Sequence, residues 1–204
     1  MVRKNHPNAG NRRQHQKSKT GRSDVFGMFR QVGMDSAEEL YELMKLFKDD
    51  GILPESTQLR DPGTMHVTYL EKRKLTRELQ GFAQGFNTHE AIDRINIGCE
   101  QSRHLPIIAS LGRVSLMDRR DETLVVRLDH NQTVADEYSY ATSALRALHV
   151  NIRGKFTPHI GLVRVPGLPI VDKQIIAHHI QEIVPEEVTL DTLRVDPPLR
   201  HQRD

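Results

Sequence analysis

Several short stretches of this chain alternate apolar and polar residues, the pattern of β-strands that bury one face. The two clearest run from Met65 to Leu70 and from Phe156 to Val163, and each carries one histidine. A third stretch, Pro106 to Met117, is followed after a polar turn by Thr123 to Leu128, which predicts an antiparallel hairpin. A last strand is predicted from Val188 to Val195, just before a pair of prolines.

Apolar residues at helical spacing predict four helices between these strands. The first begins with Asp35 or Ser36 as N-cap and stops at Gly51. The others are predicted over 75–87, from Thr133 to His149 and from Asp172 to Glu182. A strand from Asp24 to Val32 could open the fold. Strand, helix and hairpin in this order favour an α+β fold with antiparallel pairing, and the repeated histidine strand with its neighbouring helix suggests two similar lobes.

Composition limits the chain to an ordinary globular protein. Its 204 residues are 37% hydrophobic and 27% charged, and no apolar run approaches the roughly 20 residues that span a bilayer. No secretory signal is visible at the N-terminus. The one cysteine, Cys99, excludes an internal disulfide framework and is compatible with a reducing compartment. We therefore expect a cytoplasmic protein without membrane contact, and a monomer.

Positive charge is concentrated at the N-terminus. Residues 1–23 carry seven basic and no acidic side chains, whereas the rest of the chain holds 22 basic and 27 acidic residues, a net charge of −5. We expect 1–23 to be a disordered basic tail, 24–198 to be a single domain and 199–204 to be a frayed end. Such a tail can either neutralise RNA phosphates or remain a solvated segment that binds nothing specific, and the second interpretation is favoured.

The two strand histidines, His66 and His159, are the residues most able to carry chemistry. Side chains of a strand repeat with period two, so His66 and Thr68 share one face. Imidazole titrates near neutral pH, and two such groups across a cleft could act as one general base and one general acid. A hydroxyl such as that of Thr68 could donate a hydrogen bond to a phosphoryl oxygen. This combination is suited to metal-free phosphodiester chemistry.

At this level of detail the chain resembles a known family. His66-Val67-Thr68-Tyr69-Leu70 and Thr157-Pro158-His159-Ile160-Gly161-Leu162-Val163-Arg164 are similar to the paired H-x-[T/S] motifs of the two-histidine (2H) phosphoesterase superfamily. The closest branch is the RNA 2′,3′-cyclic phosphodiesterase, or 2′-5′ RNA ligase-like, group. In that group an aromatic residue and a proline precede the second motif and an arginine follows it, as Phe156, Pro158 and Arg164 do here. The resemblance covers about residues 60–195.

The resemblance implies a bilobal α+β fold, with two antiparallel-sheet lobes around a central cleft and helices outside. It implies hydrolysis of a 2′,3′-cyclic phosphate, on an RNA end or a nucleotide, to a 2′-phosphate with no metal or other cofactor. His66 would protonate the leaving 3′ oxygen, His159 would activate water, and Thr68 would contact the phosphate. In a near-symmetric site the two histidines could also exchange these roles.

The second motif departs from the family pattern, because Gly161 stands where the family has threonine or serine. The missing hydroxyl could be replaced by Thr157, on the same strand face, by Arg164, or by a main-chain amide. In a straight strand Arg164 lies on the opposite face from His159, so its use requires a twist or a bulge. An alternative function is a non-catalytic module that keeps the cleft and binds a nucleotide or an RNA end.

The remaining candidates have simpler explanations. His178 and His179 are adjacent in a predicted helix and cannot face one ligand together, so we interpret them as solvated, and no metal motif stands out. Arg103, Arg113 and Arg127 could line a phosphate path, but alternate charges on a hairpin are usually a solvated face. Cys99 has no activating partner in the sequence.

Overall fold

One antiparallel sheet organises the part of the chain that the computed structural model describes, which is residues 27–70, 88–117, 122–150, 152 and 156–196. The sheet has seven strands. In chain order they are β1 (Gly27–Val32), β2 (Gln58–Leu59), β3 (His66–Leu70), β4 (Ile107–Leu116), β5 (Thr123–Leu128), β6 (His159–Arg164) and β7 (Glu187–Asp196). The predicted hairpin, both histidine strands, the opening strand and the last strand are confirmed, while the short β2 was not predicted.

The order of the strands brings the two histidine strands together. Across the sheet the order is β2, β6, β3, β1, β7, β4 and β5, and β6 also pairs with β5, so the sheet closes on itself. All of these pairings are antiparallel. The expected antiparallel α+β architecture is therefore confirmed as a single sheet, and its division into two lobes stays a prediction.

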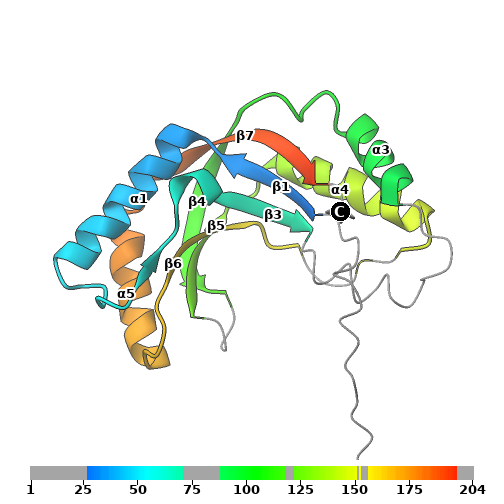
Figure 1. Cartoon of the computed structure of the whole chain (residues 1–204). Coiled ribbons are helices and arrows are strands. Elements are labelled where there is room, and N and C mark those ends of the chain that lie inside the picture. Colours follow the sequence, from blue (N-terminus) through cyan, green and yellow to red (C-terminus); the bar gives the residue numbers. More distant parts are fainter. Residues whose placement is uncertain (1–26, 71–87, 118–121, 151, 153–155, 197–204) are drawn as a thin grey trace, which may run out of the picture.

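Four helices of the described chain flank the sheet. They are α1 (Met34–Asp49), α3 (Thr88–Gly98), α4 (Gln132–Ala147) and α5 (Ile170–Ile183). Figure 1 shows α1 and α5 beside one part of the sheet and α3 and α4 beside the other, with the strands between them. The predicted helices that correspond to α1, α4 and α5 are confirmed. The helix predicted over 75–87 lies outside the described residues, and α3 was not predicted. None of the helices in the described ranges is long and apolar enough to cross a membrane.

The start of α1 differs from the prediction. Its N-cap is Gly33, and neither Asp35 nor Ser36 caps it. The Ser36 hydroxyl instead accepts a hydrogen bond from the Thr189 amide at 3.0 Å, so this side chain ties the helix to β7. After the helix, Gly51 takes a positive φ of 74°, a conformation that glycine adopts without steric cost.

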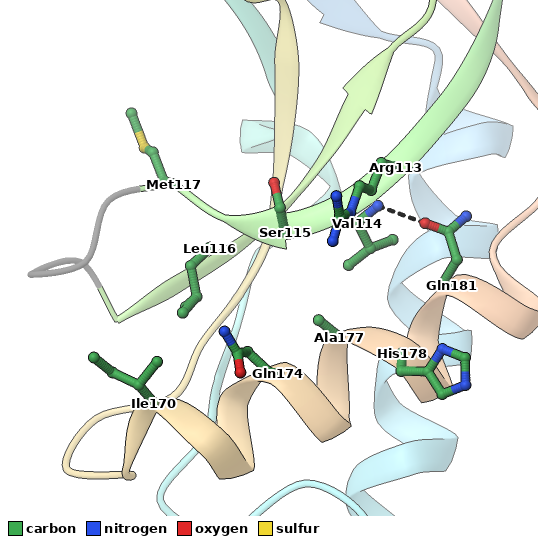
Figure 2. A pocket seen from close by; sticks show the side chains of 10 residues that line it. All are labelled: Arg113, Val114, Ser115, Leu116, Met117, Ile170, Gln174, Ala177, His178 and Gln181. Atoms are coloured by element: carbon green, nitrogen blue, oxygen red, sulfur yellow. Dashed lines mark hydrogen bonds between the residues drawn. The ribbon is translucent and has the colours of Figure 1, made fainter.

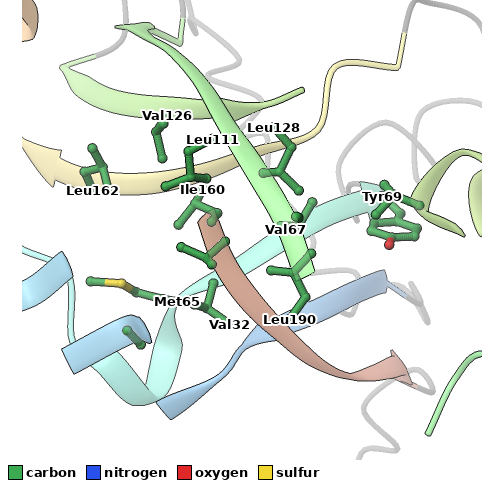
Figure 3. Packing of buried hydrophobic residues seen from close by; sticks show 14 of the residues in the cluster. Val32, Met65, Val67, Tyr69, Leu111, Val126, Leu128, Ile160, Leu162 and Leu190 are labelled. Carbon is green, nitrogen blue, oxygen red and sulfur yellow. The ribbon is translucent and has the colours of Figure 1, made fainter. Parts of the chain in front are cut away.

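The core is one cluster of apolar side chains between the helices and one side of the sheet (Figure 3). Val67 of β3, Ile160 of β6 and Val126 of β5 are fully buried in it. Since side chains alternate along a strand, the residues before and after each of these three point to the other side of the sheet. His66, Thr68 and His159 lie there, and we call it the histidine side.

A buried ion pair joins β1 to α4, and Tyr69 of β3 is hydrogen-bonded to it. The guanidinium of Arg30 donates to both carboxylate oxygens of Glu137, at 3.2 and 2.6 Å, and both side chains are almost wholly buried. Tyr69 and Ser102 donate to the same carboxylate at 2.8 and 2.6 Å. Because the charge pair has this many hydrogen bonds, burial is tolerated, and the network fixes β3 just after Thr68.

Candidate active site

The two candidate catalytic histidines lie on neighbouring strands of the sheet. β3 and β6 pair antiparallel with Val67 opposite Ile160. This register puts His66 opposite Gly161 and Thr68 opposite His159, all four on the histidine side. Directly opposed residues have Cβ atoms about 5 Å apart and diagonal neighbours about 7–8 Å, so the two imidazoles are diagonal neighbours that can reach one phosphate-sized group.

Both imidazoles are held in the same way. The Nδ1 atom of His66 bonds the main-chain carbonyl of Thr64 at 2.7 Å, and Nδ1 of His159 bonds that of Thr157 at 2.9 Å. A carbonyl oxygen only accepts, so Nδ1 must carry the proton in each ring. In a neutral imidazole this places the lone pair on Nε2, the atom that can take or deliver a proton at the site. Each histidine is thus oriented by the residue two positions before it.

The turn before His66 is built to present that carbonyl. A short 3₁₀ helix, Pro62–Thr64, begins after Asp61, and the Thr64 amide and hydroxyl both donate to the Asp61 carbonyl, at 2.9 and 2.8 Å. Gln31 of β1 donates to the Gly63 carbonyl at 2.7 Å. The neighbouring Phe29 ring lies 5.2 Å from the His66 ring, centroid to centroid. The His66 ring is therefore positioned from its own turn and from β1.

Aromatic packing anchors the approach to His159. Phe156 stacks on Tyr138 of α4, with ring centroids 4.0 Å apart and an angle of 6° between the planes. Tyr69 of β3 also contacts Phe156 in a T-shaped arrangement, with ring centroids 5.6 Å apart. Burial, followed by the negative charge of Glu137, raises the pKa of Tyr69 above its usual range, so its phenol stays a proton donor to Glu137. The aromatic residue of the second motif thus connects the two histidine strands.

Gly161 lies beside a guanidinium. A Cβ built on Gly161 would be 3.9 Å from Nη1 and 4.0 Å from Cζ of Arg60, and 3.9 Å from the Thr123 methyl group. These are ordinary van der Waals distances. The position that holds a hydroxyl in the family motif is therefore bordered here by Arg60, which the sequence analysis did not single out.

Arg164 returns to the histidine side through an irregularity in the pairing. Val125 of β5 is opposite Gly161 and Thr123 is opposite Arg164, with a register shift between Leu124 and Val125. Thr123 and Val125 share a face of β5, so the extra residue in β6 brings Arg164 to the face that carries Gly161. Its guanidinium donates to Glu122 at 3.1 Å.

Glu122 is itself held as a carboxylate. The main-chain amide of Gly167 donates to it at 3.0 Å, and this hydrogen bond, with Arg164 as a smaller contribution, lowers the pKa of Glu122. Arg164 therefore forms an exposed ion pair with Glu122, and a substrate phosphate would have to compete with Glu122 for its guanidinium.

The other predicted site residues have clear positions. Thr68 is half-buried on β3, opposite Phe29 of β1 and, by register, opposite His159. Thr157 is exposed, and it is its carbonyl that bonds His159. Arg127, interpreted above as a solvated residue, is the β5 partner of His159 and is exposed. It follows that Arg127 borders the site from the side opposite Thr68.

A separate hollow lies between β4 and α5 (Figure 2). Gln181 spans it, accepting from the Val114 amide at 2.6 Å and donating to the Gly112 carbonyl at 3.3 Å. Neither candidate histidine lines it, and His178 at its rim is an exposed residue near Glu182. Within the described ranges, no group of three or more histidine, cysteine, aspartate or glutamate side chains is placed to hold a metal ion. The hollow is therefore separate from the candidate site.

Sequence reasoning missed two features of the site. Arg60 lies 101 positions before Gly161 and meets it only because β2 pairs with β6. The Thr-x-His spacing is present at both histidines, Thr64 to His66 and Thr157 to His159, and this repetition was the available signal for the carbonyl contacts.

Comparison with known proteins gives a fold and no closer relationship. No family model and no curated protein matches the sequence. Among solved structures, the chain is similar to one described as a phosphoesterase, at 11% identity over 86% of this chain and 95% of that one, with a TM-score of 0.53. The chain therefore shares the fold of this phosphoesterase structure.

A particular protein of this fold is LigT of E. coli. Its structure with 3′-AMP and its apo structure each match at 11% identity over 85% of this chain and 94% of LigT, with a TM-score of 0.51. At this identity the likeness shows a shared fold.

Proposed function

We propose that this chain is a metal-independent phosphodiesterase that hydrolyses 2′,3′-cyclic phosphates, on RNA ends or in nucleotides, to 2′-phosphates. The observation that carries the proposal is the matched pair of Nδ1–carbonyl hydrogen bonds at His66 and His159, on diagonal positions of adjacent strands. Two imidazoles with the same orientation and opposite protonation at Nε2 are what acid–base hydrolysis of a phosphodiester needs.

The reaction divides between the two rings. His159 takes a proton from water through Nε2, and the water oxygen forms a bond to phosphorus. The bond from phosphorus to the 3′ oxygen breaks, and His66 delivers its Nε2 proton to that oxygen. One proton enters the site from water and one leaves with the 3′ hydroxyl, so the pair ends with exchanged protonation states. Thr68, opposite His159 in the register, donates to a non-bridging oxygen.

The proposal takes the two histidine strands to line the central cleft of a bilobal fold, as the family pattern implies. One of the neighbours of this fold, LigT, was crystallised with 3′-AMP. That supports a nucleotide or an RNA end as the partner here. A second candidate function is a non-catalytic module that binds the same groups, and Gly161 favours it because one hydroxyl of the family site is missing.

The test is turnover of an oligoribonucleotide that ends in a 2′,3′-cyclic phosphate. His66→Ala and His159→Ala should each lose at least about 100-fold in kcat, as expected for removal of a general acid or base. The matched control is His130→Ala, because His130 is an exposed residue between β5 and α4. EDTA should leave turnover unchanged. No turnover by the parent protein, with retained binding of the same RNA, would favour the binding module instead.

A further inference from the structure

Arg60 lies beside position 161, where the family motif has a hydroxyl and this chain has glycine. Its guanidinium would be in van der Waals contact with a side chain at position 161, since Nη1 is 3.9 Å from the Cβ position of Gly161. Position 161 is opposite His66 in the register set by Val67 and Ile160. The guanidinium therefore borders the same side of the sheet as both histidines.

The main chain holds Arg60 in this place. Gln58 and Leu59 of β2 pair with Arg164 and Val163 of β6, and the Arg60 amide donates to the Leu162 carbonyl at 3.3 Å. The chain then continues directly through Asp61 into the 3₁₀ turn whose Thr64 carbonyl orients His66. Arg60 and His66 are thus presented by one short segment whose ends are both hydrogen-bonded.

The charge of Arg60 is not neutralised by a carboxylate of the described chain. Arg164, by contrast, is paired with Glu122 at 3.1 Å, and Arg30 is buried against Glu137. Arg60 is exposed, so its guanidinium can meet a ligand from solvent. An exposed guanidinium beside a pair of imidazoles suits a phosphoryl group, because its planar set of N–H donors matches two phosphate oxygens.

We propose that Arg60 binds the non-bridging oxygens of the substrate phosphate and replaces the hydroxyl that Gly161 lacks. This rests on the proposed function in that the phosphate is the one attacked between His66 and His159. Thr68 donates from one side of the phosphate and Arg60 from the other, so charge that develops on the oxygens in the transition state meets a donor at each end. Gly161 leaves the space beside the guanidinium open, because a side chain at this position would begin 3.9 Å from Nη1 of Arg60.

The experiment is a double-mutant cycle between Arg60 and Gly161. Arg60→Ala should lower kcat/KM on the cyclic-phosphate oligoribonucleotide by about 100-fold to 1,000-fold, and Arg60→Lys should lose less because it keeps a point charge. Gly161→Thr alone should not raise the rate. In the Arg60→Ala background, Gly161→Thr should recover at least about 10-fold, because the hydroxyl then has room to reach the phosphate. Arg146→Ala, at the exposed end of α4, is the control.

Direct binding separates this proposal from the proposed function. Calorimetry with inorganic phosphate and with adenosine 2′-monophosphate should show affinity that falls about 10-fold or more in Arg60→Ala and is unchanged in Arg146→Ala. If the parent protein hydrolyses the oligoribonucleotide, and Arg60→Ala changes neither the turnover nor the affinity for phosphate, the Arg60 proposal is wrong while the proposed function stands. If turnover is absent but phosphate binding depends on Arg60, the phosphate site is supported and the hydrolase is not.

Discussion

Val67 of β3 is the register partner of Ile160 of β6, and this one pairing determines the geometry of the candidate site. Both side chains are fully buried in the core. Because alternation along a strand has period two, burying this pair turns His66, Thr68, His159 and Gly161 to the other side of the sheet. Core packing thereby places the candidate catalytic side chains on one side of the sheet. A register shift of one residue would turn them toward the core.

The carbonyl contacts predict the tautomer of both histidines. In the neutral state His66 and His159 should each carry the proton on Nδ1, because the Thr64 and Thr157 carbonyls accept from that atom. Long-range ¹H–¹⁵N correlation spectra of the imidazoles distinguish the two tautomers. Exposed His130 is the comparison and should show the mixture typical of solvated imidazole. A proton on Nε2 in both neutral rings would contradict the arrangement.

Removal of one partner of the buried Arg30–Glu137 pair should strongly destabilise the protein. Glu137→Gln leaves the Arg30 guanidinium buried without its counter-charge, and we expect a loss of about 3–5 kcal/mol in the free energy of unfolding. Urea denaturation measures it. Glu38→Gln on the exposed side of α1 is the control and should stay within about 0.5 kcal/mol of the parent. A loss of under about 1 kcal/mol for Glu137→Gln would mean that water reaches the pair.

The protein should lose stability in alkali. Burial, followed by the negative charge of Glu137, raises the pKa of Cys99 from 9.0 to about 11, so the folded state holds the thiol proton more tightly than the unfolded state. The contribution is fully present below pH 9.0 and is lost as the pH rises through about 11. Tyr69, whose pKa is also raised, adds to the same trend.

Unfolding in urea at pH 8 and at pH 10.5 tests this pH dependence. The parent should be less stable at the higher pH, and Cys99→Ala should show a smaller difference between the two. An equal difference in both proteins would show that Cys99 does not contribute.

Arg127 should distinguish long substrates from short ones. It is exposed on β5 directly opposite His159, where it can meet a phosphate of an RNA chain next to the one that reacts. Arg127→Ala should raise KM several-fold for a cyclic-phosphate oligoribonucleotide. It should also reduce the slope of log affinity against log salt concentration by about 1, as expected for the loss of one phosphate contact. KM for a cyclic mononucleotide should change little, and Arg94→Ala on α3 should affect neither. Equal effects on both substrates would assign Arg127 to the reacting phosphate instead.

The sequence predicted the strands and the histidine pair because both are local patterns. Alternation over five or six residues identified β3 and β6, a short apolar run after a polar turn identified β5, and the common side of His66 and Thr68 follows from period two. The start of α1 was misplaced since Gly33 caps through its backbone, while Ser36, which resembles a cap, bonds β7. The helix α3 has its apolar residues interspersed with polar ones, so its pattern is hard to separate from that of its neighbours.

The rest of the site depends on pairings between distant segments. The sequence left Arg164 on the wrong face of a straight strand, and the register shift between β5 and β6 returns it. Arg60 had no motif of its own, because its relation to Gly161 exists only through the β2–β6 pairing. Single-sequence patterns do not encode such a register.

The most direct test of the proposed function is ³¹P NMR of the product formed from 2′,3′-cyclic AMP or from a cyclic-phosphate RNA end, in the presence of EDTA. Cleavage of the bond from phosphorus to the 3′ oxygen, with His159 activating water and His66 protonating the leaving oxygen, predicts the 2′-phosphate as the sole product. The same product should be absent with His66→Ala and with His159→Ala. A 3′-phosphate, no product at all, or equal product from the parent and both variants would contradict the proposed mechanism.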